Sequence, residues 1–196
     1  MSQHWLNIRL GLEHVLDWQA YDHILFLMVL VVAYSFAGWK RVLWLVSVFT
    51  IGHTLSLILA VFGLVNLSDK YVEVLIPITI LITALYNIFT ARQKERQKSV
   101  TLLYIATASF GIIHGLGFYS SFKMFSSYTE NKFLPLMEYA LGIEAAVIIV
   151  AISVLILAFI FQNILKIARR DWILVISSIV IGVILPILRD NIHLIF

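Results

Sequence analysis

Three histidines and one glutamate stand inside apolar runs long enough to cross a membrane, where an ionisable side chain is costly unless it is paired or hydrated. They are His23, His53, His114 and Glu144, and Asp22 directly precedes the first of them. Imidazole nitrogens and carboxylate oxygens are ligands for Zn²⁺, Ni²⁺ and similar divalent ions. These five residues are therefore predicted to bind a divalent metal ion.

Further polar residues lie near these candidate ligands. The hydroxyl groups of Thr50 and Thr54 flank His53 and could orient its ring. Others stand near the expected outer ends of the helices: Glu13, His14, Asp17 and Glu138. We expect this second group to line an entrance to the site or to support its ligands.

The elements that position these residues are six apolar runs, each close to the roughly 20 residues that a helix needs to cross a bilayer. They cover approximately residues 21–38, 41–64, 71–90, 100–125, 133–161 and 172–188. None alternates as the strands of a membrane barrel do. The chain is predicted to be all-α, one bundle of about six transmembrane helices in a single domain, residues 1–196. At about 1.5 Å per residue, three of the ligands lie roughly 9–13 Å below the outer surface and His23 roughly 3 Å below it.

Composition supports a membrane location. Of the 196 residues, 61% are hydrophobic and only 13% are charged, so lipid must solvate much of the chain. The net charge of +3 could suggest a nucleic-acid partner, but the basic residues lie in short loops where membrane topology explains them. The chain has no cysteine, which excludes disulfides and thiolate metal sites.

Orientation follows from the loops, because cytoplasmic loops carry an excess of lysine and arginine. The richer side holds Lys40, Arg41, Arg92, Lys94, Arg96, Lys98, Lys166, Arg169 and Arg170. The poorer side holds Arg9, Lys70, Lys123, Lys132 and Arg189. We expect the richer side in the cytoplasm and both termini outside.

Residues 1–20 precede the first apolar run and contain apolar side chains at helical spacing, among them Trp5, Ile8 and Leu12. This pattern predicts a short amphipathic helix on the outer face. It could serve as an anchor or as a lid over the bundle.

Four short motifs together resemble the HupE/UreJ family over residues 11–146. They are DH at 22–23, FTIGH at 49–53, HGLGF at 114–118 and LGIE at 141–144. The resemblance implies a small bacterial inner-membrane protein that acts as a nickel permease or nickel accessory protein. It carries a functional role over to Asp22, His23, His53, His114 and Glu144. The spacing of His14 and the single histidine of the later motif depart from the family pattern, which indicates a divergent branch.

Three functions follow from these residues. The first is transport of a divalent cation, with nickel favoured by the resemblance. The second is a zinc-dependent hydrolase acting on a lipid or membrane peptide at the outer leaflet, in which Glu144 would be the general base. The third is a non-catalytic factor that assembles a metallocentre. Lipid and a divalent cation are the expected partners in each case.

Overall fold

The structure, a computed structural model, describes residues 3–17, 21–65, 68–93, 100–117 and 133–193. Within these ranges the chain forms seven α-helices, which confirms the all-α prediction. They are α1 (Gln3–Leu16), α2 (Asp22–Val31), α3 (Trp39–Val61), α4 (Asp69–Thr90), α5 (Val100–Gly117), α7 (Phe133–Phe159) and α8 (Arg169–His193). A 3₁₀ turn (Phe36–Gly38) precedes α3, and a π-helical turn (Ile160–Ile164) extends α7.

Four segments are long and apolar enough to cross a membrane: Phe36–Val61, Lys70–Thr90, Phe133–Ile164 and Arg169–His193. Two further apolar helices are shorter, Asp22–Val31 and Leu103–Gly117. The expected count of six full spans is therefore not confirmed. The end of the expected span 100–125, residues 118–125, lies outside the described residues.

The expected span 21–38 is wrong as one continuous helix, because α2 ends at Val31 and the chain turns before the 3₁₀ turn begins at Phe36. A helix that ends among apolar neighbours leaves its last carbonyl groups in need of donors. Asn87 of α4 donates to the carbonyl of Val29 in the last turn of α2, and Arg169 of α8 donates to the carbonyl of Ala33, two residues beyond the helix. These two side chains provide donors to the backbone where α2 ends.

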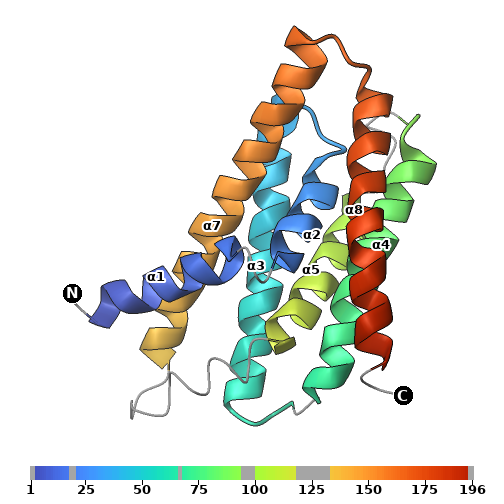
Figure 1. Ribbon diagram of the computed structural model, residues 1–196. Helices are drawn as coiled ribbons and strands as arrows, with labels where there is room; N and C mark the ends of the chain where they lie inside the picture. Colours follow the sequence, from blue (N-terminus) through green and yellow to red (C-terminus); the bar gives the residue numbers. More distant parts are fainter. Residues whose placement is uncertain (1–2, 18–20, 66–67, 94–99, 118–132, 194–196) are drawn as a thin grey trace.

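The long helices run beside one another, and α1 lies across α7 before the chain enters α2 (Figure 1). α2 contacts α4, α7 and α8, and α3 packs between α5 and α7. α2 is consequently surrounded by longer helices, and most of its side chains are buried.

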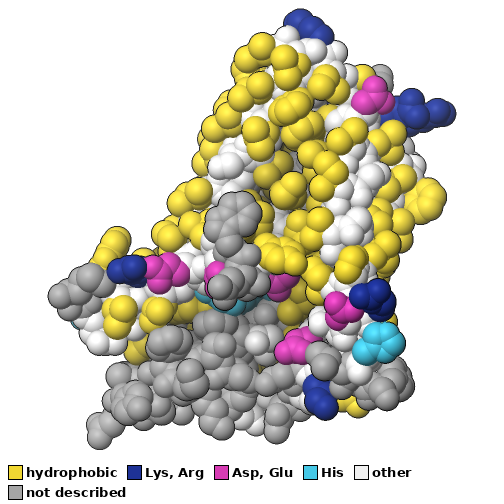
Figure 2. All heavy atoms as spheres, viewed as in Figure 1, with side chains coloured by type: hydrophobic (Ala, Val, Ile, Leu, Met, Phe, Trp, Pro, Cys, Tyr) yellow, Lys and Arg dark blue, Asp and Glu magenta, His cyan; other side chains and the backbone are white. Residues whose placement is uncertain are grey.

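Apolar side chains cover the long helices in Figure 2, while charged side chains gather toward the two ends. Trp44 is 68% exposed and Phe89 is 81% exposed, which is the surface that a helix bundle presents to lipid. The protein is an integral membrane protein with one helical bundle.

Candidate metal centre

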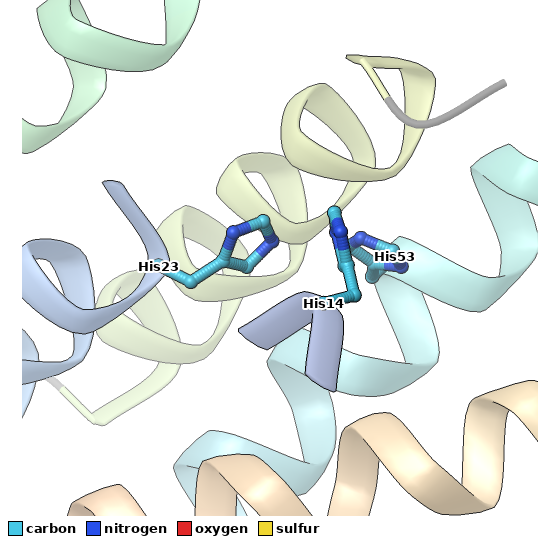
Figure 3. A group of neighbouring side chains, drawn as sticks. All are labelled: His14, His23 and His53. Atoms are coloured by element: carbon cyan, nitrogen blue, oxygen red, sulfur yellow. The ribbon is translucent and has the colours of Figure 1, made fainter. Parts of the chain in front are cut away.

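Three histidines from three different helices meet inside the bundle: His14 of α1, His23 of α2 and His53 of α3 (Figure 3). One ring nitrogen of each lies within 4.8 Å of one from each of the others. His23 and His53 were expected in such a group, whereas His14 was expected only at its entrance. The ring of His23 lies 5.7 Å from that of His53, closer than helix counting suggested, because α2 begins partway along the longer helices (Figure 1).

The imidazoles of α2 and α3 are sealed from solvent: His23 is 2% exposed and His53 is 0% exposed. Within the described residues, Nε2 of His23 and both ring nitrogens of His53 have no hydrogen-bond partner. A buried polar group left unsatisfied costs about 1–3 kcal/mol, so such groups call for a ligand or water. A divalent cation shared by the rings would satisfy them.

Asp22 fixes the orientation of His23. Its Oδ1 accepts hydrogen bonds from Nδ1 of His23 at 3.1 Å and from the backbone N–H of His23 at 2.9 Å. A proton held on Nδ1 leaves Nε2 with its lone pair available for a metal. Asp22 therefore contacts the ring of a candidate ligand, in the arrangement that commonly supports metal-bound histidines.

His114 of α5 adjoins the group, with its ring 5.3 Å from that of His23, and is 1% exposed. Its Nδ1 donates to the carbonyl of Phe110 at 2.8 Å, so Nε2 keeps its lone pair and has no hydrogen-bond partner within the described residues. His114 lies beside the three-histidine group but is not a member of it.

Burial, and the neighbouring His23, lower the pKa of His14 to about 3. The imidazole of His14 is therefore neutral at physiological pH. Neutral imidazole is the form that binds metal ions.

Glycines set the spacing of the helices that carry these rings. A Cβ on Gly111 or Gly115 of α5 would stand 2.2 Å from the carbonyl oxygen of Phe49 or His53 on α3. Where α1 crosses α7, a Cβ on Gly11 or Gly142 would likewise overlap a backbone carbonyl of the other helix. Backbones in such close contact fix the positions of the side chains they carry.

The HupE / UreJ protein family model matches residues 1–188. The chain belongs to this family. No curated protein and no solved structure matched the chain. HupE/UreJ membership makes this a membrane protein related to nickel or cobalt transport, and the histidine group is suited to such a cation.

Glu144 of this HupE/UreJ chain is not brought into the histidine group. Its Oε1 accepts a hydrogen bond from Ser47 at 2.5 Å, and it lines a groove of about 610 Å³ between α3 and α7. Thr50 and Thr54 line the same groove. Glu144 was expected beside the histidines as a ligand or a general base, but Ser47, to which it is bonded, precedes His53 by six residues, roughly 9 Å along α3.

The expected entrance residues also have other contacts. Glu13 pairs with Arg9 on the exposed face of α1, and Asp17 is exposed beyond the end of that helix. Glu138 is 8% exposed and is bonded to side chains of α1. Of the four residues predicted for this role, the structure brings only His14 to the cluster.

A layer of phenylalanines next to the histidines was not predicted. Phe26 follows His23 by three residues, whereas Phe49 and Phe110 precede His53 and His114 by four. Because α2 runs opposite to α3 and α5 (Figure 1), the three phenylalanines lie one helical turn from the histidines toward the same end of the bundle. The Phe26 ring lies 5.0 Å from that of Phe49 and 5.6 Å from that of Phe110. A phenylalanine three or four residues from each histidine was the available signal in the sequence. The HupE/UreJ histidines are thus closed off by aromatic rings on that side.

Proposed function

We propose that this protein binds a divalent cation, with nickel as the first candidate, at His14, His23 and His53 and carries it across the bacterial inner membrane. The observation that supports this is the group of three imidazoles whose ring nitrogens lie within 4.8 Å of one another. Imidazole suits nickel and its neighbours in the transition series. His114, whose ring lies 5.3 Å from that of His23, is the candidate for a fourth ligand.

The direction of transport is inward, with both termini outside and the arginine- and lysine-rich loops in the cytoplasm. The phenylalanine layer then separates the histidines from the cytoplasm. Release of the cation to that side requires the rings of this layer to move apart, so the bundle has to alternate between two states.

Uptake into proteoliposomes tests transport. We expect vesicles containing the wild-type protein to accumulate labelled Ni²⁺ and vesicles containing His53→Ala to accumulate none, because one of the three proposed ligands is lost. The matched control is His193→Ala, which removes an exposed histidine at the end of α8 and should leave uptake unchanged.

Uptake no greater than that of empty vesicles would contradict transport. If the protein still bound Ni²⁺ with an affinity that depended on His53, the third function, assembly of a metallocentre, would replace it. The hydrolase has no support from a specific contact, because Glu144 is bonded to Ser47 rather than placed beside the histidines.

A further inference from the structure

One ligand of the site comes from a helix unlike the others. His14 belongs to α1, which lies across α7 and is not among the candidate membrane spans. His23 and His53, in contrast, are buried residues of α2 and α3 within the bundle. The position of His14 depends on how α1 is attached, so the attachment of α1 decides whether the group has three members or two.

α1 is attached to α7 at two places. Near its C-terminal half, Gly11 faces the carbonyl of Tyr139, and Gly142 of α7 faces the carbonyl of Ile8. Near its N-terminus, His4 and Asn7 contact Glu138. The first attachment sets the distance between the helices. The second fixes the direction in which α1 points from that crossing.

Both carboxylate oxygens of Glu138 are used in this attachment. Oε1 accepts from Nδ1 of His4 at 2.5 Å, and Oε2 accepts from Nδ2 of Asn7 at 2.7 Å. A glutamate side chain that is 11% exposed and accepts two hydrogen bonds from one helix is engaged in holding that helix. It is poorly placed to attract cations from solution.

We propose that Glu138 is a positioning residue for the cation site: by binding His4 and Asn7 it holds α1 against α7, so that His14 reaches His23 and His53. Glu138 contacts no cation itself. The proposal rests on the proposed function only in requiring that the histidines bind a cation.

Co²⁺ is a suitable probe, because its visible absorption changes with the number and type of its ligands. The measurement is the Co²⁺ dissociation constant and absorption spectrum of the full-length protein in detergent. His14→Ala provides the spectrum of the site without the ligand from α1. We expect Glu138→Gln to raise the dissociation constant at least about tenfold and to give a spectrum like that of His14→Ala, because charge-assisted hydrogen bonds are the strong ones.

Two further variants separate positioning from other roles. The double variant His4→Ala, Asn7→Ala keeps Glu138 and removes its partners, and it should weaken Co²⁺ binding as much as Glu138→Gln does. The pair Asn7→Cys, Glu138→Cys can be joined by a short thiol crosslinker, since the natural chain has no cysteine. Crosslinking should restore the wild-type spectrum although Glu138 is absent.

The matched control is Arg9→Gln, which removes an exposed ion pair with Glu13 from α1 without touching Glu138. It should bind Co²⁺ as the wild type does. Wild-type affinity in both Glu138→Gln and the double variant would overturn the proposal. So would a loss of affinity in Glu138→Gln alone, because Glu138 would then act on the cation directly. Failure of the wild type to bind Co²⁺ would instead refute the proposed function.

Discussion

Gly115 of α5 offers the sharpest test of the packing that forms the site. A Cβ at this position would stand 2.2 Å from the carbonyl oxygen of His53, and real Cβ atoms essentially never approach closer than 3.0 Å. Gly115→Ala therefore forces α3 and α5 apart by at least 0.8 Å. The nearby hydroxyl of Ser56 can rotate away, but the carbonyl of His53 is backbone and has to move with its helix.

A shift of this size exceeds the roughly 0.5 Å within which a functional site must hold its groups. We expect Gly115→Ala to raise the Ni²⁺ dissociation constant at least about tenfold, because His53 moves away from its partners on α1 and α2. Overpacking should also lower the free energy of unfolding by about 1–3 kcal/mol.

Competition with a chromophoric chelator in detergent measures the dissociation constant, and size-exclusion chromatography after heating reports stability. The matched control is Gly182→Ala in α8, where a Cβ would meet nothing within 4 Å. This control should keep the wild-type affinity and gain up to about 1 kcal/mol of stability, since alanine is the better helix former. Wild-type affinity and stability in Gly115→Ala would refute the close contact of α3 with α5.

Two further substitutions test the interior of the bundle. Asn87→Leu leaves the carbonyl of Val29 without its side-chain donor, so the free energy of unfolding should fall by about 1–3 kcal/mol. An unchanged melting temperature would show that the end of α2 does not depend on this bond. Glu144→Gln keeps an oxygen to which Ser47 can donate, and residue 144 lies outside the histidine group. The Ni²⁺ dissociation constant should therefore change less than about twofold. A tenfold loss of affinity in a calorimetric titration would contradict this expectation.

The sequence predicts the helical class and two of the three grouped histidines, because apolar length and isolated ionisable residues are strong local signals. It does not predict the early end of α2. Val32 and Ala33 continue the apolar run beyond the end of α2, and the side chains that donate to the carbonyls of Val29 and Ala33 come from α4 and α8. A hydropathy profile averages neighbouring residues along the chain, so it contains no information about hydrogen-bond donors that are distant in sequence.

The misplacement of His14 and Glu144 has a related cause. Positions along one helix can be counted from sequence, but the level at which two helices pack and the direction in which a residue faces depend on the neighbouring helices. Glu144 is bonded to Ser47, six residues from His53 on α3, and His14 reaches His23 and His53 where Gly11 and Gly142 let α1 approach α7 closely. The glycines indicate close contacts in the sequence, but not which helices make them.

The sealing of His23 and His53 also bears on which ions the site can accept. An ion held among nearly unexposed imidazoles has to give up its hydration shell and receives nitrogen donors in return. Mg²⁺ dehydrates reluctantly, and both Mg²⁺ and Ca²⁺ favour oxygen donors. A buried site of imidazole nitrogens therefore disfavours Mg²⁺ and Ca²⁺, because the free energy of removing their bound water is not recovered from nitrogen donors. This selectivity does not depend on the size of the site.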